Sequence, residues 1–280
     1  MLLVVFHMIL QVDNRSRKIG KSAFSLVELS IVLVILGLLV GGILSGQSLI
    51  RASEMRSVIS DSQRYITAMG TFRDKYFALP GDMANAISFW GAAHATPATC
   101  RTTSSTSAAT CDGNGDGQIG TVDGGTTVSE RFRFWQHMAN AGLIEGTYTG
   151  VAGGGGGTPV EQPVIGTNVP RSKIAKAGYY VTYFNTPVTT VDFFGDSVGN
   201  FLFFGADNNN STGAPVIKAE EAWNIDSKLD DGRPGYGKII SYPTSNASVP
   251  NCSTTASAST AVYNLSNAGT VCTFLIKTGY

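Results

Sequence analysis

The residue pattern best suited to chemistry is a run of oxygen-bearing side chains between Asp112 and Asp123. These side chains stand at positions 1, 3, 5 and 12 of a twelve-residue segment, and Gly117 fills position 6. A tight loop turns alternate side chains inward, where their oxygens can surround one hard cation, and a glycine permits the sharp turn. The spacing therefore predicts a calcium site at Asp112, Asn114, Asp116, Gln118 and Asp123.

The segment resembles the EF-hand calcium loop, and its final aspartate is similar to the one in dockerin-type loops. The resemblance implies that Asp112, Asn114 and Asp116 ligate through their side chains. It implies further that Gln118 ligates through its backbone carbonyl and Asp123 in bidentate fashion. No helical pattern precedes the loop, so a full EF-hand is not expected. The alternative is a solvated turn, because Asp, Asn and Gly favour turns for conformational reasons.

A second acidic stretch contains Asp226, Asp230 and Asp231, followed by Gly232. Aspartate and glycine in this order predict the end of a helix and a turn, with no ligand required. Alternatively, the carboxylates supply a second cation site or a contact between subunits. Their spacing fits no closed coordination loop.

No pattern for catalysis is present. The sequence lacks Gly-x-Ser-x-Gly, His-Glu-x-x-His and a phosphate-binding Gly-Lys motif. Of the three histidines, His7 precedes the apolar N-terminal run, His94 lies in a predicted loop, and His137 is expected half-buried on a short helix. We therefore expect a protein that is not an enzyme.

The most unusual single residue is Glu28, a carboxylate inside an apolar run from Phe24 to Leu44. A carboxylate within a membrane span costs roughly 2.5–3.5 kcal/mol, so it normally marks a functional position. The run has about twenty-one residues, enough to cross a bilayer. The preceding basic residues place the C-terminal bulk outside the cytoplasm; they are Arg15, Arg17, Lys18 and Lys21.

This arrangement resembles the N-terminus of type IV pilins and type II secretion pseudopilins. The shared features are a basic leader, a small residue at Ala23, Phe24-Ser-Leu-Val-Glu28-Leu, and the long apolar run. The resemblance implies cleavage between Ala23 and Phe24, methylation of Phe24, and pairing of Glu28 with the cationic N-terminus of a neighbouring subunit. Ala23 departs from the glycine that the family usually has there.

The resemblance also implies the partners and the location. The partners would be a prepilin peptidase and N-methyltransferase, homologous pilin or pseudopilin subunits, an inner-membrane assembly platform and the inner membrane. The chain would be held in the inner membrane with its head in the periplasm, and then enter a periplasmic or cell-surface filament. No nucleic-acid partner is expected, because the formal net charge is zero and 14% of residues are charged.

The function expected from these features is that of a structural subunit of a type IV pilus or type II secretion filament. The alternative is a minor pilin or adhesin-type binding module at a filament tip. An ordinary secretory signal or a plain membrane anchor would also give an apolar run. Leu44-Ser45-Gly46 is a poor signal-peptidase site, however, and a plain anchor has no use for Glu28. Translation starts at either Met1 or Met8.

The four cysteines fall into two pairs that are each close in sequence. An even number of cysteines in an exported chain favours disulfides, and no zinc-type spacing is present. The simplest pairing is Cys100 with Cys111 and Cys252 with Cys272, and the alternative is four free thiols.

One long helix must position the N-terminal features. Beyond Gly46, apolar residues recur every three or four positions up to Phe77, with charged residues between them, and the first proline is Pro80. The pattern predicts a continuous helix from Phe24 to about Phe77, about 80 Å long. Its first half fits a lipid or filament core, and its second half fits one face of a globular head.

The remaining chain predicts an α+β head in which the helix packs on a mainly antiparallel sheet with long loops. Strands are expected at 178–184, 192–194, 200–204, 237–241 and 271–277, and a short helix at 127–141. Phe89-Trp90 is expected to be buried. The predicted divisions are a leader at 1–23, a membrane half-helix at 24–46, an amphipathic half-helix at 47–79 and a head at 80–280.

Overall fold

The computed structural model describes residues 25–120, 129–153, 162–184, 199–208, 212–242, 252–255 and 259–280. The chain forms two compact units, one ending at Ile50 and one beginning at Arg51. The predicted divisions at residues 23, 46 and 79 stay predictions. The predicted strand at 192–194 lies outside the described residues.

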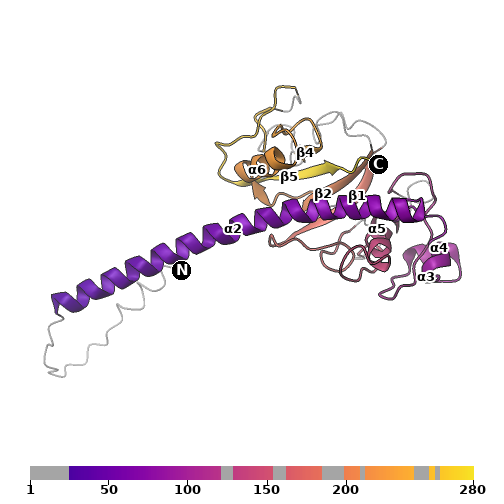
Figure 1. Cartoon of the computed structure of the whole chain (residues 1–280), viewed down its shortest axis with the longest axis horizontal. Coiled ribbons are helices and arrows are strands. Elements are labelled where there is room, and N and C mark those ends of the chain that lie inside the picture. The colour runs from indigo at the N-terminus through magenta and orange to yellow at the C-terminus, as the bar shows by residue number, and fades with distance from the viewer. Residues whose placement is uncertain are drawn as a thin grey trace, which may run out of the picture. The chain divides into compact units, whose positions relative to one another are not determined.

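The longest element is helix α2, which runs from Leu26 to Tyr76 (Figure 1). It contains no proline, and its interior glycines are tolerated along the whole length. The helix ends where Phe77 adopts a left-handed φ of 54°, three residues before Pro80. The continuous helix predicted from periodicity is therefore confirmed.

The part of α2 that belongs to the first unit has no packing partner in the described chain. Every side chain from Leu26 to Leu44 is exposed. The mean hydropathy of its most apolar 18-residue window is 2.6, which makes α2 long and apolar enough to cross a membrane.

The second unit is built on an antiparallel sheet, whose described strands number five. They pair in the order β1-β2-β5-β3, and β4 also pairs with β5. The strands are β1 (Ala177–Phe184), β2 (Gly199–Ala206), β3 (Ile217–Lys218), β4 (Ile239–Tyr242) and β5 (Thr270–Lys277). This arrangement of a long helix and an antiparallel sheet confirms the α+β fold, and β1, β2, β4 and β5 match the predicted strands.

Short helices complete this unit. They are α3 (Ile87–Trp90), α4 (Pro97–Thr102), α5 (Ser129–Asn140) and α6 (Ala219–Leu229). Helix α5 is the predicted short helix, and Gly142 after it has a positive φ of 72°, which is typical of a glycine that ends a helix. In Figure 1, α6 lies on one side of the second half of α2 and α5 on the other.

The core of the head forms where one stripe of α2 meets α5 and β1. Tyr65 packs edge-on against Trp135 and Tyr179, with ring centroids 5.1 and 5.0 Å away. Burying such aromatic groups removes large apolar areas from water, which is the main stabilising term in folding. The buried residues of α2 are Ser57, Val58, Ser62, Tyr65, Ala68, Met69 and Phe72.

Two expectations about individual residues are wrong. Phe89 is 54% exposed although its ring contacts Tyr76 and Trp90, and Trp90 itself is half-buried against the core. His137 is fully buried rather than half-buried. Its ring lies near Phe72 and Trp90, at centroid distances of 6.4 and 5.4 Å.

Candidate functional site

The chain has three candidate sites: the start of α2 and two acidic clusters in the head. At the start of α2, the Ser25 hydroxyl accepts a hydrogen bond from the Val27 N–H at 3.2 Å. The Glu28 carboxylate accepts one from the Ser25 N–H at 3.0 Å. These two bonds form a variant of the capping box in which the Ser25 hydroxyl accepts from the second rather than the third N–H of the helix, and they satisfy backbone donors at the helix N-terminus.

The capping box gives Glu28 a local role that the sequence analysis missed. The signal was present, because Ser-x-x-Glu before an apolar run is the sequence pattern of such a cap. The carboxylate also lies at the positive end of the helix dipole. Its second oxygen has no bond shown within the described residues, so Glu28 retains capacity for a further partner. The predicted cleavage residues Ala23 and Phe24 lie outside the described residues.

The described part of the predicted calcium loop, residues 112–120, is folded around two buried carboxylates that lie outside the loop. Asp82, 3% exposed, accepts hydrogen bonds from the N–H groups of Gly115, Asp116 and Gly117 at 2.7, 3.0 and 2.9 Å. Glu130, 1% exposed, accepts bonds from the N–H groups of Asn114 and Gly120, each at 3.0 Å. Backbone donors thus give the loop its shape.

The close approach of the loop to Asp82 requires glycine. A methyl group at Gly113 would lie 2.4 Å from the backbone carbon of Asp82, and Gly115 and Gly117 have φ values of 75° and 83°. The glycines of this segment therefore have a structural role independent of any cation. Sequence reasoning missed Asp82 and Glu130 because both contacts are tertiary.

Burial sets the protonation of the two anchoring carboxyl groups. It raises the pKa of Glu130 to about 7, although hydrogen bonds from Gly120 and Asn114 oppose the shift and the charges of Asp82 and Asp116 add to it. Burial also raises the pKa of Asp82. Neighbouring acidic groups in a desolvated setting can hold a proton or attract a cation.

Only some of the predicted loop ligands come together. Asn114 Nδ2 donates to Asp116 Oδ2 at 3.0 Å, and the Gln118 N–H donates to Asp116 Oδ1 at 2.8 Å. Asp112 accepts a bond from the Ile87 N–H of α3 at 2.8 Å instead. Asp123 lies outside the described residues, so the calcium loop stays a prediction.

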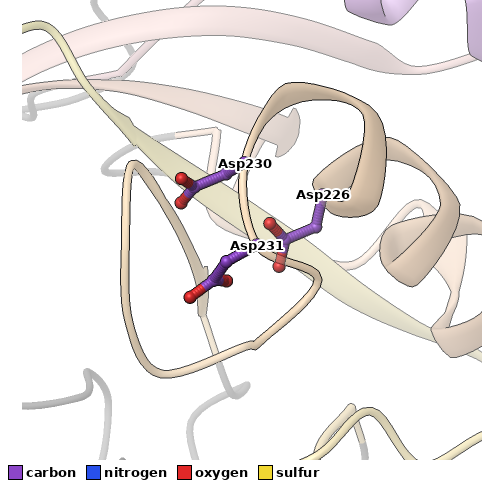
Figure 2. Close-up of side chains that lie close together, drawn as sticks. All are labelled: Asp226, Asp230 and Asp231. Atoms are coloured by element: carbon purple, nitrogen blue, oxygen red, sulfur yellow. The ribbon is translucent and has the colours of Figure 1, made fainter.

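The second acidic stretch forms a compact triad. Figure 2 shows Asp226 on α6 and Asp230 and Asp231 in the turn that follows it. One oxygen from each carboxylate lies within 4.8 Å of the others, and within the described ranges this is the only such group of potential metal ligands. Helix α6 ends at Leu229, so the predicted helix end and turn are confirmed.

Each member of the triad also has a bond within the chain. Asp226 is fully buried and accepts bonds from Tyr263 Oη at 2.7 Å and from the Gly232 N–H at 3.3 Å. Asp230 accepts bonds from the N–H groups of Lys238 and Ile239, and Asp231 from the N–H of Arg233 at 2.8 Å. The triad therefore holds the turn in place whether or not it binds a cation.

Electrostatic repulsion within the triad contributes to a raised pKa of Asp226. Burial raises its pKa to about 7, and the charges of Asp231 and Asp230 add to the shift. The hydrogen bonds from Tyr263 and Gly232 oppose it. The sequence left open whether these carboxylates meet, and the structure brings them together.

His137 is a structural residue. Its Nδ1 accepts a bond from the Gly81 N–H at 3.0 Å, so its Nε2–H faces Thr110 Oγ1 at 2.9 Å. Burial lowers the pKa of this histidine to about 3, which keeps the ring neutral. The ring thereby ties the turn after α2 to α5.

The disulfides are those predicted. Cys100 is bonded to Cys111, next to the predicted calcium loop, and Cys252 is bonded to Cys272 in β5. Both bridges close short loops in the head and restrict the unfolded chain.

Comparison with known proteins gives no relative. No protein-family model, no curated protein and no solved structure matches this chain. What the chain shows by itself is a class of architecture: a long apolar N-terminal helix followed by an antiparallel-sheet head, consistent with a pilin-like layout.

Proposed function

We propose that this chain is a pilin-like or pseudopilin-like filament subunit of a type IV pilus or a type II secretion system, with a structural rather than catalytic role. The observation that carries the proposal is the division of α2. Its first part is apolar with every side chain from Leu26 to Leu44 exposed, whereas one stripe of its second part is buried in the head. A helix divided in this way requires partners outside the chain.

The proposed maturation follows from the N-terminal pattern. A prepilin peptidase and N-methyltransferase would cut before Phe24 and methylate it, and the chain would wait in the inner membrane with its head in the periplasm. An inner-membrane assembly platform would then transfer it into a filament of homologous subunits. Pilin-type residues support this proposal, since Glu28 stands five positions into the processed chain.

The physical role proposed for Glu28 is pairing across subunits. A carboxylate alone in hydrocarbon is costly, and so is the cationic N-terminus of a neighbour. Pairing them offsets both costs and fixes the axial register of adjacent helices. The capping box leaves one carboxylate oxygen of Glu28 for this second bond.

The first test is mass spectrometry of the N-terminal peptide from a cell envelope. A peptide beginning with N-methylated Phe24 would support the prepilin pathway. An intact leader, or a start near Gln47, would contradict it and leave an ordinary anchor or a secreted protein.

The second test is Glu28→Ala in the full chain. We expect normal membrane insertion and a strong loss of filament incorporation, because the neighbour's N-terminal charge loses its partner. Glu54→Ala is the matched control, since Glu54 lies on the same helix and pairs with Arg51 at 3.0 Å within the head. Normal incorporation of the Glu28 variant would refute the pairing role.

A tip-located minor pilin or adhesin-type module is the second candidate. The observation that favours it is Phe77, which is 93% exposed and held in a left-handed conformation beside a cavity of about 640 Å³. Exposed apolar groups held at an energetic cost often mark binding surfaces. Copy number in purified filaments separates the two roles, because a tip module would be present in few copies.

We propose calcium as the cation of the acidic clusters. The loop pattern at 112–123 supports it by spacing, and the triad supports it by its converging oxygens. Calcium titration of the full chain, followed by its thermal midpoint, tests the proposal. Asp116→Asn and Asp231→Asn tell which cluster is responsible, because the variant of the binding cluster should lose the calcium-dependent rise of the thermal midpoint. If calcium does not raise the thermal midpoint of the wild type, neither cluster binds calcium.

A further inference from the structure

A cavity of about 640 Å³ lies in the head, where the end of α2 meets the C-terminal segment. Its walls come from the last turn of α2 and the residues that follow it, from Gly115 and Gly117, and from Gly279 and Tyr280. Arg73 belongs to one wall, where its guanidinium stacks on the Tyr280 ring at 5.0 Å. A volume of this size is in the range of small-molecule sites.

Phe77 brings to this cavity an aromatic ring that the head does not use. The ring is 93% exposed, and it contacts no other ring of the described chain, whereas the neighbouring Tyr76 contacts Phe72, Phe89 and Trp90. Phe77 also keeps a left-handed φ of 54°, which is unfavourable for a residue other than glycine. A large apolar group held in water in this way fits a partner that covers it.

Two polar side chains of the walls have unused hydrogen-bonding capacity. Within the described residues, Arg73 forms no ion pair. The exposed side-chain amide of Asn85 likewise has no bond there, although the Asn85 backbone carbonyl accepts one from Ser88 at 3.2 Å. An amide offers both donors and an acceptor, and a guanidinium offers donors in one plane. Both groups can therefore bond to hydroxyl groups of a ligand.

The charge of the walls favours a neutral ligand. Among the described lining residues, Arg73 is the one cation and Asp82 the one carboxylate, and Asp82 already accepts three backbone bonds. A single cation does not make the electrostatic groove that a nucleic acid requires. A pure hydrocarbon is disfavoured too, because it would cover polar groups without bonding to them. The ligand that fits is neutral and has one apolar face and several hydroxyl groups.

We propose that this cavity binds a hexopyranose. The C–H face of the sugar ring stacks on Phe77, and its hydroxyl groups bond to Asn85 and Arg73. A pyranose joins an apolar face and a rim of hydroxyl groups in one rigid unit. The inference rests on the tip-located binding module, the second candidate function, and it names the class of ligand that such a module would take.

The experiment uses the full chain in micelles of a polyoxyethylene detergent, which carries no sugar. The probes are the methyl glycosides of glucose, galactose, mannose and N-acetylglucosamine, and the readout is saturation-transfer difference NMR. We expect saturable binding of at least one glycoside, with the strongest transfer to the C–H protons of one ring face. Comparison of that glycoside with its free sugar tells whether the site takes a sugar alone or one linked in a glycan, and either preference supports the assignment.

Two further compounds test which property of the sugar matters. Sorbitol has the hydroxyl groups but no ring face, so it should bind about tenfold more weakly than the glycoside. Benzoate has a flat ring and a negative charge. If benzoate binds more tightly than every glycoside, the cavity is a site for an aromatic anion and the proposal is wrong.

The main variant is Phe77→Gly, which removes the ring and suits the positive φ, so the head should fold as well as the wild type or better. It should weaken glycoside binding about tenfold, near the upper limit for a stacked aromatic contact. Phe77→Trp keeps a ring and should bind nearly as well as the wild type. Asn85→Ala should weaken binding about fivefold through the lost hydrogen bond. Phe89→Ala is the matched control, because Phe89 is 54% exposed and is not among the residues that line the cavity.

The proposal fails if no glycoside binds saturably, if sorbitol binds as tightly as the glycosides, or if Phe77→Gly binds like the wild type. A different outcome concerns a second copy of the chain. If the wild type binds no sugar and Phe77→Gly enters filaments poorly, the ring is a contact between subunits instead.

Failure here is distinguishable from failure of the proposed function. Few copies per filament without sugar binding would remove only the ligand class and leave the tip module. Many copies per filament with sugar binding would remove the tip role and leave the cavity as a sugar site on a structural subunit.

Discussion

The two parts of α2 share one backbone geometry but have opposite surroundings. From Leu26 to Leu44 every side chain is exposed, and a methyl group added at Gly37, Gly41 or Gly42 would meet no atom within 4 Å. Between Arg51 and Tyr76 an apolar stripe is buried, and Arg51 donates to Glu221 of α6 at 2.5 and 2.7 Å. The difference shows that helix formation and helix stabilisation have separate causes here.

The second part of the helix is stabilised by its own chain, whereas the first part is completed only by something outside the chain. Helical propensity alone is marginal in water, and most helical stability comes from packing an apolar face. Substitutions in the second part should therefore act on folding of the head, and those in the first part on membrane residence and assembly.

The largest expected effect comes from Phe72→Ala. Phe72 is fully buried and packs on Tyr76, Trp90 and His137. Removing a buried aromatic ring should lower the free energy of unfolding of the head by about 3–5 kcal/mol. Urea unfolding of the full chain in micelles, followed by near-UV circular dichroism, measures it.

Leu36→Ala is the matched change in the first part. Leu36 is 51% exposed, so the free energy of unfolding of the head should stay the same. A comparable loss in both variants would mean that the two parts do not differ in what stabilises them.

The next effect concerns a buried carboxylate of the head. Burial raises the pKa of Asp226 from its ordinary 3.8 to about 7, so the folded state binds this proton more tightly than the unfolded chain. The contribution of the protonated Asp226 carboxyl to the free energy of unfolding is complete below about pH 3.8. It is lost as the pH rises through about 7. Relative to the wild type, Asp226→Asn should gain up to about 4 kcal/mol of unfolding free energy between about pH 4 and pH 8, since each pKa unit corresponds to about 1.4 kcal/mol.

The comparison with the wild type at each pH is essential. His137 acts in the opposite sense, because burial lowers its pKa to about 3 and its contribution is lost as the pH falls below about 6.5. Glu28→Gln is the control, since that exposed carboxylate lies in the first unit. If the difference in unfolding free energy between Asp226→Asn and the wild type does not change with pH, burial of the Asp226 charge does not set the pH dependence.

Features that depend on near neighbours in the sequence could be predicted, whereas those that depend on tertiary contacts could not. The helix, the α+β layout and both disulfides follow from periodicity and spacing, which depend on near neighbours. The roles of Asp82 and Glu130 depend on contacts with a loop 33 and 16 residues away, for example Gly115 to Asp82 and Asn114 to Glu130. No local pattern encodes such contacts, and for the same reason the burial of His137 was missed.

The capping box at Ser25 and Glu28 differs from these tertiary contacts, because a local sequence pattern does encode it. Ser25 and Glu28 carry the local Ser-x-x-Glu signal of a helix cap, and the cost of a carboxylate in a membrane is an independent reason for a functional Glu28. Both roles are compatible, because a carboxylate accepts several hydrogen bonds.

The smallest expected effect concerns two glycines of α2. A methyl group at Gly41 meets no atom within 4 Å, whereas one at Gly70 lies 2.6 Å from the hydroxyl of Tyr280, whose ring also stacks on Arg73. Replacing a helical glycine by alanine gains up to about 1 kcal/mol of helix propensity. At Gly70 displacement of Tyr280 should offset that gain, so the free energy of unfolding of the head changes by only a few tenths of a kcal/mol.

Gly41→Ala should instead leave the head unchanged and reduce filament incorporation modestly. Small residues let helices approach closely in an apolar setting, and a methyl group at the contact keeps them apart. Quantifying each variant in purified filaments and in urea unfolding separates the two effects. If Gly41→Ala enters filaments as well as the wild type, this glycine is no helix contact, and the first part of α2 assembles through its larger side chains.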